Sequence, residues 1–97
     1  MNAPNPELIN QLTTLFGAMA DPSRAQILLA LYVGDKRSGD LANMLDITHS
    51  AVSHQMRWLR EKNLVASHKE GREVIYSLSD ECIRQLIEIA LKHIGEK

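Results

Sequence analysis

Cysteine is almost absent from this sequence, because Cys82 is the only one among 97 residues. A single cysteine cannot form a disulfide within the chain, which fits a reducing compartment, so we expect a cytoplasmic protein. Glycine and proline together supply only eight residues, too few for a linker or a disordered tail. The length therefore predicts one folded domain over residues 1–97.

Long apolar runs and an excess of positive charge are also missing. No stretch approaches the roughly 20 apolar residues of a membrane helix, and residues 1–7 do not have the pattern of a secretory signal. We therefore expect no membrane partner. A net charge of −1 excludes a uniformly basic nucleic-acid binder. Residues 48–76 nevertheless carry five cations and three anions, net +2, which leaves room for a locally basic surface.

Motifs of catalysis are absent as well. The chain contains no glycine-rich phosphate loop, no Gly-x-Ser-x-Gly and no His-Glu-x-x-His. We therefore do not expect an enzyme.

Helix-start signals divide the first half of the chain. Asn5-Pro6 and Asp21-Pro22 each place a capping side chain before a proline in the first helical position. They predict helices over residues 5–20 and from 21 to about 34. The apolar spacing that follows predicts a short third helix capped by Ser38 and a fourth helix over about 49–62. The period then changes to strands over 64–68 and 73–78 around a turn that contains Gly71. A last helix, capped by Ser79, is predicted over residues 80–96.

The third and fourth helices, residues 38–62, are joined by only three residues, which is the layout of a helix-turn-helix. Val52, Met56 and Leu59 share one face of the fourth helix and are predicted to face the core. The other faces carry hydrogen-bonding side chains and an arginine, as a DNA recognition helix does. The hairpin over 64–78 would then contact the DNA backbone or minor groove as a wing. The candidate DNA-binding residues are His49, Ser50, Ser53, His54, Arg57, Lys69 and Arg72.

The fold expected from these elements is mainly α with a β-hairpin, a winged helix-turn-helix in the order α-α-α-α-β-β-α. A polar outward face occurs on every surface helix, so a solvated surface is the alternative interpretation of these residues.

Several stretches resemble the ArsR/SmtB family of winged-helix, metal-sensing repressors. They are FGAMADPSR (16–24), GDLA (39–42), SAVSHQM (50–56), EGR (70–72) and YSL (76–78). The resemblance implies a bacterial homodimer that binds a two-fold operator in double-stranded DNA, represses transcription and is released by an inducer. One departure is Asp46, where many helix-turn-helix proteins have glycine; aspartate tolerates the left-handed backbone better than most residues.

The inducer site is expected on the last helix. Residues 36–40 contain no cysteine, so the thiolate site of arsenic- and cadmium-type members is absent. Zinc-type members carry Asp-x-His, ten residues and then His-x-x-His or His-x-x-Glu, whereas this chain has Asp80-x-Cys82, ten residues and His93-x-x-Glu96. Such a donor set suits zinc best, and its thiolate would also admit cadmium or cobalt.

The spacing of these ligands requires a dimer. Cys82 and His93 lie on one stripe but are separated by about 16 Å along the helix, whereas zinc ligands bind at about 2.0–2.3 Å. Two antiparallel copies of the helix would complete two sites across a two-fold axis, with Leu86 and Ile89 as the apolar seam. We expect residues 5–20 and 80–96 to form the homodimer interface.

Other interpretations of these residues stay open. Asp80 would be favoured in any first helical turn, Cys82 could be a small core residue, and His93 and Glu96 could be solvated. A winged-helix regulator without metal is the alternative function, with Cys82 as a lone thiol sensor.

Overall fold

The computed structural model describes residues 3–95 and forms five helices with a three-stranded antiparallel sheet, which confirms the winged helix-turn-helix fold. In chain order the elements are α1 (Pro6–Met19), α2 (Pro22–Val33), β1 (Lys36–Arg37), α3 (Ser38–Leu45), α4 (His49–Glu61), β2 (Val65–Glu70), β3 (Glu73–Leu78) and α5 (Glu81–His93).

The helix starts follow local chemistry. The predicted caps Asn5 and Asp21 accept hydrogen bonds from the backbone N–H groups of Glu7 and Arg24. Two predicted caps were wrong. Ser38 is the first residue of α3, whose N-cap Arg37 makes no side-chain capping bond. The cap of α5 is Asp80, one residue after the predicted Ser79, and its carboxylate accepts from the N–H of Ile83.

The sheet contains one strand more than predicted, and the order is β1-β3-β2. β1 has two residues, too short for a periodic signal, and pairs with Ile75 and Tyr76 of β3. An ion pair between Arg37 and Glu73 also joins these two strands. β2 extends to Glu70, beyond the predicted end at residue 68, and Glu70 pairs with Glu73 across a two-residue turn. Gly71 has a φ of 63° in that turn, a conformation that glycine adopts without strain.

The core forms between α2, α3, α4 and the sheet. Val52, Met56 and Leu59 of α4 are at most 1% exposed, which confirms the predicted core face of that helix. Asp46 closes α3 with φ 55° and ψ 49°, the left-handed conformation that allows the tight connection to α4. The helix-turn-helix is therefore held in place by the hydrophobic core.

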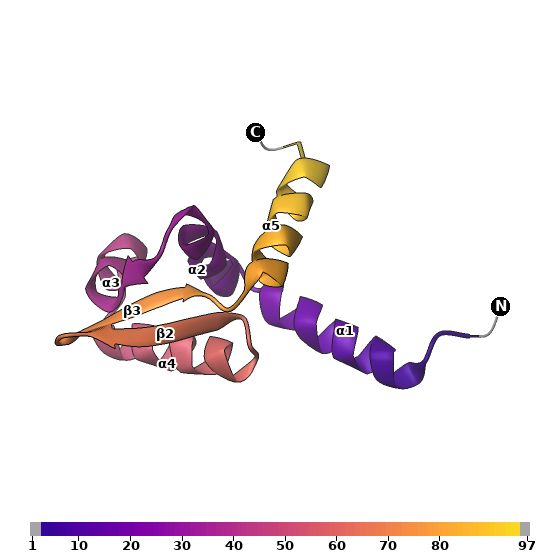
Figure 1. Cartoon of the computed structure of the whole chain (residues 1–97), viewed down its shortest axis with the longest axis horizontal. Coiled ribbons are helices and arrows are strands. Elements are labelled where there is room, and N and C mark those ends of the chain that lie inside the picture. Colours follow the sequence, from indigo (N-terminus) through magenta and orange to yellow (C-terminus); the bar gives the residue numbers. More distant parts are fainter. Residues whose placement is uncertain (1–2, 96–97) are drawn as a thin grey trace.

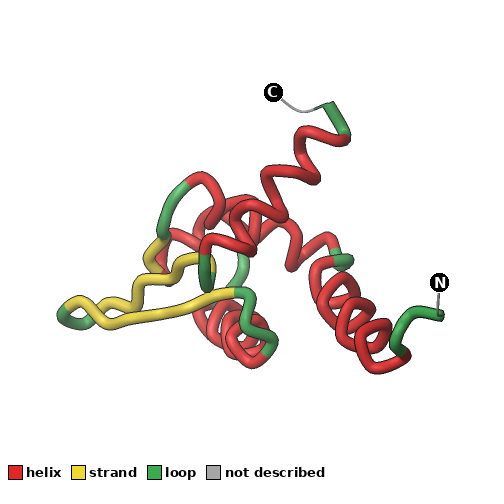
Figure 2. Tube along the Cα trace, turned by 45° about the vertical axis from the view of Figure 1, so that its right-hand side comes forward, coloured by secondary structure: helices red, strands yellow, loops and turns green. Residues whose placement is uncertain are grey.

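Two helices project from the body of the domain. Figure 1 shows α1 and α5 leaving the same end of the molecule in different directions, and Figure 2 shows the same separation after a rotation of 45°. The apolar stripe of α1 faces solvent, because Leu8, Leu12 and Phe16 are each about half exposed. None of the helices among residues 3–95 combines the length and apolar character needed to span a membrane.

Candidate DNA-binding surface and sensor helix

The exposed face of α4 gathers the five predicted recognition-helix residues. Thr48 caps the helix by accepting a hydrogen bond of 3.1 Å from the N–H of Ala51, which fixes the first turn. All five predicted side chains are exposed, and together they line one shallow depression of about 450 Å³. They are His49, Ser50, Ser53, His54 and Arg57. Short hydrogen-bonding groups at the start of the helix and a cation one turn later form a surface suited to base edges and phosphate.

The wing adds a second, cationic cleft of about 440 Å³ between α4 and the sheet. Arg57 and Arg60 line it from α4, and Lys69 lines it from β2. The guanidinium of Arg60 donates a hydrogen bond of 2.9 Å to the Ser67 hydroxyl, so α4 and β2 are joined at this cleft. Arg72, the other predicted wing residue, is exposed in the turn at the tip.

Sequence reasoning missed Arg60, Ser67 and Tyr76 as members of this surface. Ser67 pairs with Tyr76 across the hairpin, two residues from Lys69 on the same strand. Alternation along β2 places Ser67 and Lys69 on one face, and Arg57 and Arg60 are neighbours one turn apart on α4. The sequence periods of the strand and the helix therefore indicate which residues share a face. They do not indicate that these two faces meet, because that depends on how the wing packs against α4.

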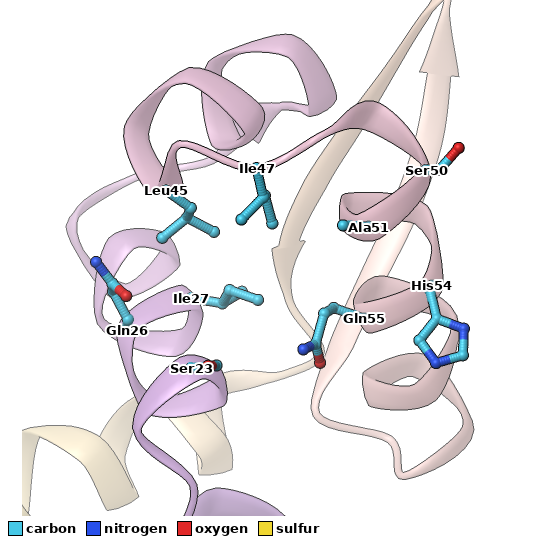
Figure 3. Close-up of a pocket in the computed structure, with 9 residues that line it drawn as sticks. All are labelled: Ser23, Gln26, Ile27, Leu45, Ile47, Ser50, Ala51, His54 and Gln55. Carbon is cyan, nitrogen blue, oxygen red and sulfur yellow. The ribbon is translucent and has the colours of Figure 1, made fainter.

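A cavity of about 560 Å³ lies between α2 and the first half of α4. Figure 3 shows Ile27, Leu45 and Ile47 pointing into it, with Ser23 and Gln55 at the lower edge and His54 turned outward. Among residues 3–95, no carboxylate, lysine or arginine lines this cavity. It adjoins the α4 depression through Ser50 and His54.

On α5, the predicted metal-ligand stripe is exposed. Cys82 and His93 are exposed, and Ile89 between them is 64% exposed, whereas Ile83 and Ile87 face the core. The interpretation of Cys82 as a core residue was therefore wrong. Asp80 uses one carboxylate oxygen, Oδ1, to cap the helix at 2.9 Å from the N–H of Ile83.

The structure brings no three metal-binding side chains together within residues 3–95 of one chain. α5 ends at His93 rather than near residue 96, and the fourth predicted ligand, Glu96, lies outside the described residues.

A polar cluster joins α5 to α2. The Tyr32 hydroxyl donates a hydrogen bond of 2.9 Å to Glu88 Oε2, and Arg84 donates one of 2.8 Å to the carbonyl oxygen of Tyr32. The bond to Glu88 raises the pKa of Tyr32, with smaller contributions in the same direction from burial and from the charge of Glu88. α5 is thus oriented on α2 by side chains away from the ligand stripe.

Known proteins resemble this chain in sequence. A family model described as "Bacterial regulatory protein, arsR family" matches residues 21–67. The chain is 40% identical over 86 residues to the transcriptional repressor SmtB homolog of Synechocystis sp., covering 89% of this chain and 65% of that protein. It is 41% identical over 83 residues to the HTH-type transcriptional regulator NmtR of Mycobacterium tuberculosis, covering 86% and 69%. A cadmium resistance regulatory protein CadC homolog of Staphylococcus aureus is 35% identical over 83 residues, covering 84% and 69%. The match thus spans about two thirds of each relative.

Solved structures resemble the fold over nearly the whole chain. The solution structure of apo-NmtR matches with a TM-score of 0.83 at 38% identity, covering 96% of this chain and 79% of that one. HlyU from Vibrio cholerae N16961 matches with a TM-score of 0.82 at 32% identity, covering 91% and 96%.

Proposed function

Because the chain belongs to the ArsR family of bacterial regulatory proteins, a family of DNA-binding transcriptional regulators, we propose that it is a cytoplasmic repressor that binds a two-fold operator as a homodimer. In this proposal α4 enters the major groove. His49, Ser50, Ser53 and His54 contact base edges, because they occupy the exposed start of the helix, and Arg57 contacts phosphate. The symmetry of the dimer then requires two half-sites related by a two-fold axis.

The cleft between α4 and the wing supports a phosphate contact beside the groove. Arg57, Arg60 and Lys69 all line it, and cations that neutralise phosphates supply most of the salt-dependent affinity for DNA. The bond from Arg60 to Ser67 holds the wing against α4. Arg72 at the tip would reach the next stretch of backbone or the minor groove.

Dimerisation is supported by apolar side chains that the single chain does not cover. α1 exposes Leu8, Leu12 and Phe16, and α5 exposes Ile89. A monomer rarely exposes so many large apolar groups on two adjacent elements. Pairing α1 and α5 with their symmetry mates would bury both stripes.

Zinc is the inducer that the residues of α5 fit best. The observation that carries this proposal is that Cys82, Ile89 and His93 are all exposed on one stripe, which is separate from the core-facing Ile83 and Ile87. Asp80 and Cys82 of one chain, with His93 and Glu96 of its partner, would form each site. Capping uses only Oδ1 of Asp80, so Oδ2 is not occupied by that bond. Cadmium or cobalt could replace zinc at a site with one thiolate, and one relative is described as a cadmium resistance regulator.

Bound zinc would supply a cross-link between the two α5 helices. The residues of this chain would carry its effect to DNA, because the residue before the cap of α5 is bonded to the turn that follows α4. The N–H of Ser79 donates to the carbonyl oxygen of Leu64 at 3.1 Å, and its hydroxyl donates to that of Asn63 at 2.7 Å. A dimer angle that suits zinc but not two adjacent major grooves would make metal and operator compete through a coupling free energy.

Zinc titration of the protein–operator complex tests this proposal. The operator is first selected from random duplex DNA by the metal-free protein, and binding is followed by fluorescence anisotropy. We expect zinc to weaken operator binding by about 5-fold to 150-fold. Cys82→Ala and His93→Ala should abolish this response and leave metal-free binding intact, whereas Gln85→Ala, on the same helix, should behave as the wild type. Unchanged operator affinity with stoichiometric zinc bound would reject the proposal.

A thiol sensor without metal is the second candidate, because Cys82 is an exposed free thiol. It would form an intersubunit disulfide or an adduct with a small thiol. Operator release by oxidant, together with indifference to zinc and to chelator, would favour this candidate.

A further inference from the structure

Arg24 of α2 closes the end of α1. Its Nε donates a hydrogen bond of 2.6 Å to the carbonyl oxygen of Ala18, and its Nη2 donates one of 3.3 Å to that of Gly17. Carbonyls in the last turn of a helix lack the N–H partner four residues on and favour a cation. α1 has no basic residue in its own last turn, so Arg24 supplies that cation from the next helix.

The same guanidinium lies over the ring of Trp58 on α4, with its central carbon 4.2 Å from the ring centroid. A planar guanidinium can stack on an indole while its N–H groups donate in its own plane. Lys62 also lies over this ring, at 5.4 Å. Within residues 3–95, Arg24 forms hydrogen bonds to the end of α1, whereas Lys62 forms none there. One side chain therefore touches α1 and α4 while belonging to α2.

This junction matters because α1 has few other attachments. Ala18 is its only buried residue, and the helix projects from the body in both views (Figures 1 and 2). The first half of α4 borders the cavity of about 560 Å³ between it and α2 (Figure 3). That cavity is lined by Ser23, next to Arg24, and by Gln55, three residues before Trp58. The contact between Arg24 and Trp58 thus bridges α2 and α4 beside a gap in their packing.

We propose that Arg24 is a positioning residue for operator recognition, which sets the angle between α1 and α4 through its bonds to Gly17 and Ala18 and its stack on Trp58. This inference rests on the proposed dimer, in which α1 lies at the two-fold axis and α4 reads each half-site. The angle between the two helices then sets the distance between the two copies of α4, and hence the half-site spacing that the dimer prefers. Arg24 would act on this spacing without touching DNA.

The test compares operators whose half-sites are moved together or apart one base pair at a time. Arg24→Lys keeps the charge but loses the planar stack, and Trp58→Leu removes the ring. We expect both variants to lose about tenfold in affinity at the preferred spacing and to bind the shifted spacings more evenly than the wild type. Trp58→Phe, which keeps a ring, should restore much of the preference. Trp58 is the only tryptophan, so its emission should change in Arg24→Lys and report the lost stack directly.

Lys62→Gln is the matched control, because it removes the other cation over Trp58 without touching α1, and we expect an unchanged spacing preference. Circular dichroism and sedimentation establish that each variant is folded and dimeric; Trp58→Phe gives the mildest perturbation if Trp58→Leu does not fold. Folded, dimeric Arg24→Lys with the spacing profile of the wild type would overturn the inference. A wild type that prefers no spacing would reject the two-fold operator of the proposed function, and this inference with it.

Discussion

The Ser79 hydroxyl donates a hydrogen bond of 2.7 Å to the carbonyl oxygen of Asn63, and this bond joins the residue before the cap of α5 to the turn that follows α4. Asn63 has a φ of 59°, so it turns the chain sharply between α4 and β2. The two residues connect the proposed zinc site to the proposed recognition helix over a short distance. We therefore expect Ser79 to transmit part of the zinc response.

Ser79→Ala should reduce the ratio of operator affinities without and with zinc, while zinc itself still binds. The backbone bond from Ser79 to Leu64 remains in this variant, so the fold should persist. Anisotropy titrations with and without zinc measure the ratio, and calorimetry measures zinc binding. Ser79→Thr keeps the hydroxyl and should behave as the wild type; an unchanged ratio in Ser79→Ala would exclude this route.

Tyr32 predicts a pH dependence of stability. Its pKa is raised above the ordinary value of 10.0, mainly by the hydrogen bond to Glu88. A raised pKa means that the folded state holds the proton more tightly than the unfolded state, so stability is fully present below pH 10 and falls as the pH rises through the folded value. Tyr32→Phe should therefore be slightly less stable at neutral pH, and the difference from the wild type should shrink above about pH 10.

Melting temperatures of both proteins across that pH range measure the effect, since the other titrating groups are common to both. Glu88→Gln is the companion variant. In its background, the difference in melting temperature between the proteins with Tyr32 and with Tyr32→Phe should be smaller. A constant difference from neutral to high pH would show that the bond between Tyr32 and Glu88 makes no proton-linked contribution.

Local chemistry allowed much of the fold to be predicted. Asn5 and Asp21 carry capping side chains before prolines, and the apolar spacing of α4 identifies Val52, Met56 and Leu59 as core. In these cases the deciding interactions lie within one or two turns of the residue itself. The cap of α5 was misplaced by one residue because Ser79 and Asp80 are both good capping residues. Ser79 instead bonds to Asn63, far away in the sequence.

Features that depend on distant partners could not be predicted. β1 has two residues and exists only because it pairs with Ile75 and Tyr76. The bond between Arg60 and Ser67 and the stack of Arg24 on Trp58 likewise arise when separate elements meet. The proposed zinc site, in contrast, is predicted from the sequence, because the spacing of Cys82 and His93 along one helix indicates that its two halves come from different chains.

Leu59 should be a large contributor to stability. Its exposed fraction is 0%, and it is the last of the three core-facing residues of α4. Leu59→Ala should lower the free energy of unfolding by about 2–5 kcal/mol, because it removes buried methyl groups and leaves a cavity. Met44→Ala, at a residue that is 54% exposed, should change it by less than about 0.5 kcal/mol. Urea denaturation at one fixed dimer concentration measures both, and equal losses would contradict the core assignment.

The cleft between α4 and the wing predicts a change in salt dependence. Lys69→Ala removes one of its cations, so the slope of log affinity against log salt concentration should become shallower by about 1. Affinity should fall to a similar degree on operator and on random DNA, because phosphate contacts carry no sequence information. Lys92→Ala removes the same charge from exposed α5 and should leave the slope unchanged. Equal slopes in all three proteins would mean that the cleft holds no phosphate.

Mixed dimers test the division of the proposed zinc site between two chains. Homodimers of Cys82→Ala or of His93→Ala carry a defect in both sites, so neither should release operator when zinc is added. In a heterodimer of the two variants, both defects fall in the same site. The other site keeps Cys82 from one chain and His93 from its partner, so the mixture should regain a zinc response.

Native mass spectrometry verifies that the heterodimer forms, and the operator titration is then repeated on the mixture. Mixing Cys82→Ala with the double variant Cys82→Ala/His93→Ala restores no complete site and is the matched control, which should stay unresponsive. Ligands drawn from a single chain would predict no recovery in either mixture, since every chain then carries a defect. The separation of Cys82 and His93 by three turns of one exposed stripe already opposes that arrangement, and recovery in the first mixture alone would exclude it.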